Sequence, residues 1–208
     1  MKEYPHIQAS TGNLFREIQG AYIFDKIDGS NIRAEWRRKR GWYKFGSKTQ
    51  LLRPDDKFLG NAVTVFVDKM SEPLAKFAYD NKYTHLNVFM EYWGEHSFAG
   101  NHDLNDEMNL TLFDICPDNK GIVGPSRFLK LCGDLPVSLP NYFGQRNWTR
   151  GFVDSIRKGD SDIIPTFEGV VGKSGDGHSL IMAKAKTQKW IDKVKNTFKE
   201  KADAILNS

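Results

Sequence analysis

The stretch YIFDKIDGSNIRAEW, residues 22–36, decides both the fold and the chemistry expected of the chain. An apolar run over 22–24 leads to Lys26, a Gly-Ser-Asn turn follows, and an alternating segment over 32–36 leads away. This pattern predicts a strand, a tight turn and a second strand, paired as a hairpin. Lys26 would then lie half-buried beside backbone donors, a setting in which an amine can act as a nucleophile. In the alternative interpretation its ammonium reaches into solvent.

Length and composition set the broad class of the protein. The 208 residues are enough for one large domain with a substantial core, and the net charge of +4 fits a polyanionic partner without requiring one. Cys116 and Cys132 have no metal-like spacing. There is no signal-peptide pattern, and no stretch approaches the ~20 apolar residues of a membrane helix. We therefore expect a cytoplasmic protein without a membrane partner.

The remaining sequence predicts helices and strands in separate groups. Helices are expected at 59–79, interrupted or restarted at Pro73, and at 125–131, 149–158 and 189–206, and strands at 85–93, 108–115, 166–172 and 179–186. Residues 133–148, rich in Pro, Gly and Asn, are predicted as loop. The expected fold class is α+β, with antiparallel sheets flanked by helices. We expect a single domain over 1–208, with 188–206 as a C-terminal helix.

Several polar residues are associated with the predicted strands. Lys184 and Lys186 alternate on the last strand, so a period of two residues places both side chains on one face. Two lysines on an otherwise apolar strand are costly unless they meet anions. Glu95 and Glu168 could supply carboxylates, which would also suit a divalent cation or a ribose hydroxyl. Together with a nucleophilic Lys26, these residues indicate a nucleoside-triphosphate site.

Five short motifs follow one another over residues 26–186. They are Lys26-Ile27-Asp28-Gly29, Gly94-Glu95, Phe113-Asp114, Glu168-Gly169-Val170-Val171 and Lys184-Ala185-Lys186. In type and order this series resembles the covalent nucleotidyltransferase superfamily, which contains ATP-dependent ligases and mRNA capping enzymes. One Lys-x-Asp-Gly is a weak signal, but five motifs in order are specific. The resemblance implies a nucleotidyltransferase domain, the ATP-grasp-like ligase adenylation fold.

Within that superfamily, Ser30-Asn31 is similar to the phage-type RNA ligases, which tend to carry Thr/Ser-Asn after the glycine. DNA ligases and capping enzymes more often place an arginine two residues past it, and Arg33 lies two residues further on. A minimal ATP-dependent DNA ligase core and a non-catalytic nucleotide- or RNA-binding module stay open as alternatives. Because only 22 residues follow Lys186, the chain resembles a catalytic domain without an appended C-terminal domain. A separate RNA-binding or end-healing partner could then complete it.

The resemblance also implies a reaction, that of an AMP-forming polyribonucleotide ligase in RNA repair. Lys26 attacks the α-phosphorus of ATP and forms lysyl-AMP, the AMP passes to an RNA 5′-phosphate, and an RNA 3′-OH displaces it. Lys184 and Lys186 would favour the neutral amine of Lys26 and stabilise charge on the α-phosphate. Glu168 would hold Mg²⁺ or Mn²⁺. The expected cofactors are thus ATP and a divalent cation, and the expected partners are RNA ends.

The remaining nucleotide contacts are also implied by the resemblance. Asp28 belongs to the nucleotide site, Glu95 would accept from the ribose hydroxyls, and Phe113 would stack on adenine unless it packs in the core. Lys48 would contact the ribose or the end to be joined, and Asn31 would lie near the acceptor end. For Lys48 and Asn31 a solvated turn is the alternative.

A basic segment, residues 37–44, is predicted as the tip of a second hairpin. Its Arg37, Arg38 and Arg40, with aromatic neighbours, could follow RNA phosphates and stack on bases, although a solvated tip explains them equally well. A possible metal cluster follows Glu95, but its spacing matches no closed zinc pattern. Its members are His96, His102, Asp103 and Asp106.

Overall fold

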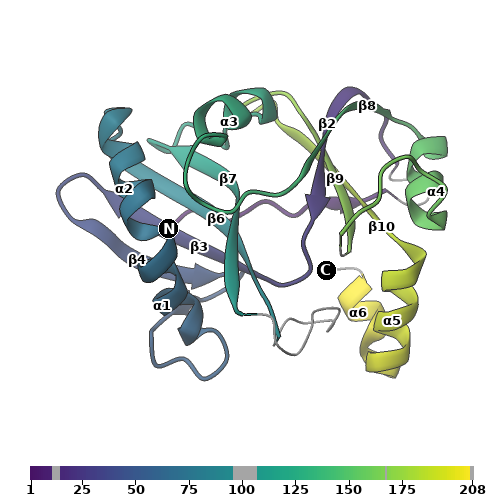
Figure 1. Cartoon of the computed structure of the whole chain (residues 1–208), viewed down its shortest axis with the longest axis horizontal. Helices are drawn as coiled ribbons and strands as arrows, with labels where there is room; N and C mark the ends of the chain where they lie inside the picture. The colour runs from purple at the N-terminus through teal and green to yellow at the C-terminus, as the bar shows by residue number, and fades with distance from the viewer. Residues whose placement is uncertain (11–14, 96–106, 167, 207–208) are drawn as a thin grey trace. The chain divides into compact units, whose positions relative to one another are not determined.

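The computed structural model describes the chain except residues 11–14, 96–106, 167 and 207–208 (Figure 1). Its described residues form two compact units. The first unit comprises Met1–Pro5, Gly29–Leu139 and Asp176–Ser179, and the second comprises His6–Asp28, Pro140–Gly175 and Leu180–Ser208. Each unit is built from separate segments of the chain. The single domain expected over 1–208 stays a prediction.

The described part of the first unit contains a five-stranded antiparallel sheet in the order β5-β4-β3-β6-β7. Its strands are β3 (Ser30–Arg37), β4 (Gly41–Ser47), β5 (Leu51–Leu52), β6 (His85–Trp93) and β7 (Asn109–Pro117). Its helices are α1 (Gly60–Lys69), α2 (Ser71–Asp80) and α3 (Pro125–Cys132). Pro73 lies in the first turn of α2, where a missing N–H is tolerated.

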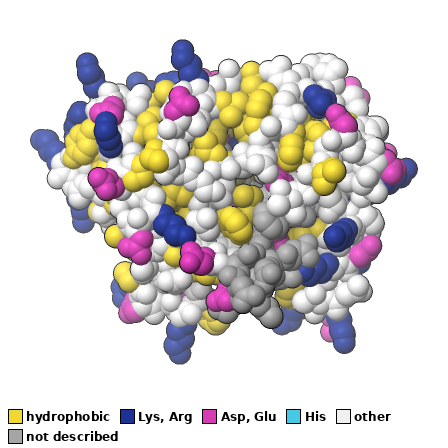
Figure 2. Space-filling view, viewed as in Figure 1, with side chains coloured by type: hydrophobic (Ala, Val, Ile, Leu, Met, Phe, Trp, Pro, Cys, Tyr) yellow, Lys and Arg dark blue, Asp and Glu magenta, His cyan; other side chains and the backbone are white. Residues whose placement is uncertain are grey.

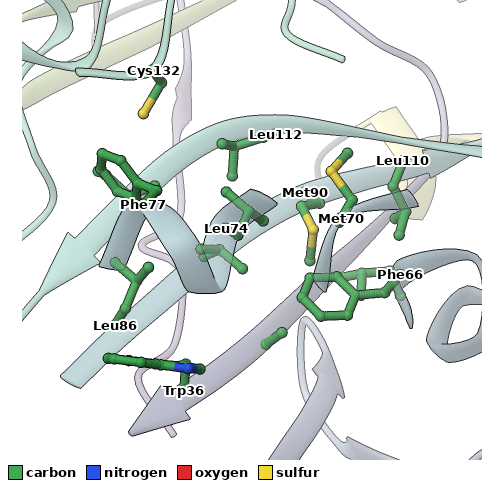
Figure 3. Packing of buried hydrophobic residues seen from close by; sticks show 14 of the residues in the cluster. Trp36, Phe66, Met70, Leu74, Phe77, Leu86, Met90, Leu110, Leu112 and Cys132 are labelled. Carbon is green, nitrogen blue, oxygen red and sulfur yellow. The ribbon is translucent and has the colours of Figure 1, made fainter. Parts of the chain in front are cut away.

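The core of the first unit lies between its sheet and its helices (Figure 3). Trp36 and Met90 come from the sheet, and Phe66 and Leu74 come from α1 and α2; all four are buried. The helix residues recur at three- and four-residue intervals, which gives each helix one apolar face. The helices predicted over 59–79 and 125–131 and the hairpin formed by β3 and β4 are therefore confirmed.

In the second unit, the described strands form a sheet in the order β1-β10-β9-β2-β8, antiparallel except for the parallel pair of β1 and β10. They are β1 (Gln8–Ala9), β2 (Ile18–Lys26), β8 (Tyr142–Trp148), β9 (Gly169–Ser174) and β10 (Ile181–Lys186). Its helices are α4 (Arg150–Lys158), α5 (Gln188–Phe198) and α6 (Ala202–Leu206). Ile23, Trp148, Val153 and Val170 belong to its core. The predicted α+β fold class is confirmed by these two units.

The hairpin predicted over residues 22–36 is wrong. Both segments are strands, but β2 pairs with β8 and β9, whereas β3 pairs with β4 and β6. Gly29 follows the first strand, and a Cβ there would lie 2.3 Å from the carbonyl oxygen of Tyr92. The chain therefore enters the first unit against β6 instead of folding back on β2. Local periodicity indicated the strands correctly, but the partners were decided by contacts distant in sequence.

The loop predicted over 133–148 contains the edge strand β8. Only one neighbour covers an edge strand, so its exposed residues Gln145, Arg146 and Asn147 need no apolar alternation. The predicted C-terminal helix is present as α5 and α6, separated by a short 3-10 turn that begins at Lys199, where φ is +44°. Among the described helices, none combines the length and apolar character needed to cross a membrane.

Candidate functional site

A buried carboxylate joins two lysines on one row of the second unit's sheet. Lys26 at the end of β2 is paired in register with Gly169 on β9, and Gly169 is paired with Lys186 on β10. Glu168, 4% exposed, directly precedes β9. Lys26 donates to its Oε2, and the Nζ of Lys186 lies 3.0 Å from its Oε1. One carboxylate thus holds both ammonium groups.

The backbone around Glu168 explains why a glycine follows it. Gly169 has φ of +156°, and a Cβ at this position would lie 2.0 Å from the carbonyl oxygen of Ala185 on β10. Only glycine permits this approach. The backbone of Glu168 is held on both sides, because its N–H donates to the Lys26 carbonyl at 3.1 Å and its carbonyl accepts from the N–H of Thr187 at 2.9 Å. Thr187 also caps α5, since its side chain accepts from the N–H of Trp190.

The charges of the cluster shift two pKa values. Burial raises the pKa of Glu168, but the positive charges of Lys26 and Lys186 outweigh burial and hold it below its usual range. Burial lowers the pKa of Lys186, and Lys26 adds to this fall while Glu168 opposes it. Lys186 also lies 4.4 Å from the centre of the Trp190 ring, a cation–π contact. Glu168 is therefore an anion, and Lys186 gives up its proton more readily than an exposed lysine does.

Lys184 and Asp28 extend the cluster within the second unit. Lys184 is buried on β10 and shares the face of Lys186, while Ala185 between them points to the core, as the period of two residues predicts. Asp28 is buried two residues after Lys26. Its charge opposes the fall that burial causes in the pKa of Lys193 on α5. Five of the predicted positions thus lie in one unit: Lys26, Asp28, Glu168, Lys184 and Lys186.

Asp25 is a residue of this region that sequence reasoning missed. It lies on the core side of β2, is 5% exposed, and accepts from the N–H of Thr166 at 3.1 Å and from the amide of Asn141 at 3.4 Å. Burial raises its pKa, and these hydrogen bonds oppose the rise. Asp25 fixes the segments beside Lys26. The sequence did contain a signal for it. Asp25 interrupts an apolar strand two residues after Ile23, so both side chains point to the same, core-facing side.

The predicted adenine, ribose and acceptor contacts lie in the first unit. Phe113 is half-buried on β7, with its ring centre 5.0 Å from that of Tyr4. Glu95 is exposed two residues after the end of β6, and Lys48 is exposed in the turn between β4 and β5. Asn31 is half-buried within β3, so the turn considered for it is wrong. The roles assigned to these four residues stay predictions.

The basic hairpin tip consists of Arg37, Arg38, Arg40 and their neighbours between β3 and β4. Arg40, Arg37 and Lys44 surround the ring of Tyr43, at 4.3, 5.7 and 5.5 Å from its centre. Arg38 lies over Tyr79 at 5.3 Å. On the face drawn in Figure 2, Lys and Arg side chains are interspersed with Asp and Glu instead of forming one continuous patch. The arginines of the tip therefore pack against the aromatic rings of Tyr43 and Tyr79.

Glu168 is the residue predicted to hold a metal ion. In the described part of the chain, no group of three or more His, Cys, Asp or Glu side chains is arranged to hold a metal ion. The cluster considered at His96, His102, Asp103 and Asp106 lies outside the described residues. Glu168 supplies one carboxylate, which fits Mg²⁺ because this ion is commonly held by one or two carboxylates, water and substrate phosphates.

Comparisons with known proteins place this geometry in a known fold. No protein-family model and no curated protein matches the chain. Solved structures of Naegleria gruberi RNA ligase do. A mutant with AMP and Mn is 16% identical with a TM-score of 0.64, covering 84% of this chain and 52% of that one. The ligase with PPi is 18% identical with a TM-score of 0.64, covering 86% and 52%.

The chain has the nucleotidyltransferase fold of the RNA ligases. A further mutant with ATP and Mn agrees, with 16% identity and a TM-score of 0.62. This likeness confirms the predicted fold, and the phage-type subfamily stays a prediction. The chain spans about half the length of the solved ligase structures it matches.

Proposed function

We propose that the chain performs the nucleotide transfer of an ATP-dependent RNA ligase, joining RNA 3′-OH and 5′-phosphate ends through lysyl-AMP and RNA-adenylate intermediates. The observation that carries this proposal is the shared carboxylate: Lys26 and Lys186 meet Glu168 on one sheet row, within an RNA ligase fold. A module that only bound nucleotides would not need Lys26 as a nucleophile. RNA repair in the cytoplasm is the setting proposed for it.

Lys26 is the proposed nucleophile. Its ammonium is held by Oε2 of Glu168 and must lose a proton before its nitrogen can attack the α-phosphorus. Lys186 binds the other oxygen of the same carboxylate, and its positive charge disfavours a second ammonium beside it. The attack forms a phosphorus–nitrogen bond to Lys26 and breaks the bond to pyrophosphate, which leaves with the bonding electron pair.

The other cluster residues would bind and orient the phosphates. Lys184 and Lys186 lie on one face of β10, where their charges would stabilise the negative charge that develops at the α-phosphate. A divalent cation bound through Glu168 would neutralise phosphate charge and assist departure of pyrophosphate. Because both Glu168 oxygens already contact lysines, such an ion would bind through water or replace one ammonium group.

Contacts from the first unit are proposed for the rest of the substrates. Phe113 would stack on adenine, Glu95 would bind the ribose hydroxyls, and Lys48 and Asn31 would contact the ends to be joined. The basic hairpin tip, with Arg37, Arg38 and Arg40, would contact RNA phosphates, with the ring of Tyr43 keeping Arg37 and Arg40 in place. A separate RNA-binding or end-healing partner would supply further contacts.

Covalent labelling tests the proposal. The protein is incubated with α-labelled ATP and Mg²⁺, and labelled protein is expected that resists alkali but releases AMP in hot acid, as a phosphorus–nitrogen bond does. Lys26→Ala should abolish labelling, whereas Lys189→Ala, an exposed lysine on α5, should not change it. Label that persists in Lys26→Ala would refute the lysyl-AMP step. Joining of nicked RNA and nicked DNA then compares substrates, and better sealing of DNA would refute the RNA assignment.

A further inference from the structure

Three aromatic rings lie on the lysine-bearing face of the second unit's sheet. Tyr22 and Phe24 precede Lys26 on β2 by four and two residues, so their side chains share its face. Tyr142, at the start of β8, is paired in register with Phe24. Its ring stacks on that of Tyr22, with centroids 5.7 Å apart and planes at 23°, and lies 5.3 Å from that of Phe24.

A bulge in β8 directs Tyr142 to this face. Between the two register pairs, Phe24 with Tyr142 and Tyr22 with Gln145, β8 contains one residue more than β2. Gly144 lies in this stretch with φ of +87°, a conformation that glycine adopts readily. Bulges at sheet edges commonly re-aim side chains next to functional sites.

The aromatic group is close to the proposed nucleophile. Two residues along β2 correspond to about 6.6 Å, and one step to the neighbouring strand adds about 4.8 Å at right angles. The Cα atoms of Tyr142 and Lys26 are therefore roughly 8 Å apart, so the two residues are near neighbours on this face. Lys173 adds a positive charge on the same face, with its Nζ 5.2 Å from the Phe24 ring centre.

Burial separates the roles of the three rings. Phe24 is 2% exposed and belongs to the packing, whereas Tyr142 is 40% exposed although it is a large aromatic residue on a sheet. Tyr22 is half-buried and supports Tyr142 from one side. A partly exposed ring that is held in place by a second ring has the properties of a base-stacking platform in single-stranded RNA recognition.

We propose that Tyr142, supported by Tyr22, stacks on a base of the RNA strand next to the nucleotide held at Lys26. This inference rests on the proposed function, because it assumes that an RNA end is brought to Lys26. Stacking needs no base-specific hydrogen bonds, so the platform would accept any of the four bases. It would position the RNA end without taking part in the covalent chemistry.

The test measures RNA joining separately from the labelling of Lys26 by ATP. Tyr142→Leu is expected to raise the KM for RNA in joining by about 5- to 150-fold, because a base stacked on an aromatic ring contributes ~1–3 kcal/mol. Tyr142→Phe keeps the ring and should restore the KM for RNA. Phe58→Leu, which removes a ring that is 90% exposed elsewhere, is the matched control and should leave joining unchanged.

Abasic RNA identifies the stacked nucleotide. In the unmodified protein, RNA that lacks the base at one position near the joint should raise the KM for RNA as much as Tyr142→Leu does. Combining this abasic RNA with Tyr142→Leu should raise the KM no further than either change alone. If no position behaves in this way, the proposal is wrong, whether or not Tyr142→Leu folds. If Tyr142→Leu raises the KM for ATP in the labelling of Lys26, the ring contacts adenine instead of an RNA base, and the proposal is also wrong. Absence of labelling in the unmodified protein would instead refute the proposed function.

Discussion

Replacement of Glu168 by glutamine provides a direct test of the shared carboxylate. Glu168→Gln keeps the shape of the side chain but removes its charge, so Lys26 and Lys186 lose the anion that both of them contact. Their two positive charges then repel each other without the Glu168 anion between them. We expect both a loss of stability and a loss of Lys26 labelling.

The magnitude follows from burial. Removal of one partner from a fully buried ion pair typically costs about 3–5 kcal/mol, because the remaining charge is left without a partner. Here the side chains of Lys26 and Lys186 are 21% and 11% exposed, so water can partly solvate them. We therefore expect the free energy of unfolding to fall by about 2–4 kcal/mol, which corresponds to a decrease in Tm of about 4–16 °C for a chain of this length.

The pH dependence identifies the cause. The pKa of Glu168 is lower in the folded than in the unfolded protein, so the unfolded state binds more protons as the pH falls. The stability that Glu168 contributes is therefore complete above its unfolded pKa of about 4.5 and is lost as the pH falls through its lower folded value. Urea unfolding at a series of pH values should show the difference between the unmodified protein and Glu168→Gln shrinking in that range.

A matched control separates this effect from loss of any carboxylate. Asp80 forms an exposed ion pair with Lys76 at 2.6 Å, and Asp80→Asn should cost less than about 1 kcal/mol because exposed pairs contribute little. If Glu168→Gln costs no more than Asp80→Asn, or if its cost is the same at pH 7 and at pH 3.5, the reasoning from the shared carboxylate is wrong.

Three further changes test other parts of the structure. Gly169→Ala should destabilise the protein by about 2–5 kcal/mol in urea unfolding, because its Cβ meets the Ala185 carbonyl; a cost below about 1 kcal/mol would contradict that close approach. Thr149→Ala removes the side-chain acceptor for the N–H of Phe152 at the start of α4 and should lower the free energy of unfolding by about 1 kcal/mol. Thr149→Ser keeps a hydroxyl acceptor and should retain most of that stability. Arg40→Gln should reduce the slope of log RNA affinity against log salt by about 0.7 for each phosphate that Arg40 neutralises, and an unchanged slope would show that Arg40 neutralises none.

Local sequence patterns predicted most elements of this fold. The helices α1 to α4 and the strands β6, β7, β9 and β10 lie close to where the periodicity placed them. Pairing was harder to predict, since the hairpin expected of β2 and β3 does not form. β8 was missed because Tyr142–Trp148 is an edge strand with a bulge and polar residues, and neither feature produces a period of two.

The candidate site shows the same division. The alternation of Lys184 and Lys186 correctly predicted a shared face, because side-chain direction in a strand follows from sequence parity. The meeting of Lys26 with Glu168 depends on pairing across 142 residues of chain, and no local pattern contains that contact. The proximity of Tyr142 to Lys26 likewise became apparent only from the register of β8.

Thr187 links the site to the helix that follows it, with a consequence for local unfolding. Its N–H donates to the Glu168 carbonyl, and its hydroxyl oxygen accepts from the N–H of Trp190 in the first turn of α5. Opening of that turn would free the backbone that carries Glu168. Hydrogen exchange at Thr187 and Trp190 should therefore report one cooperative opening event. The first turn of α5, far in sequence from Lys26, would then determine how long Glu168 stays in contact with both Lys26 and Lys186.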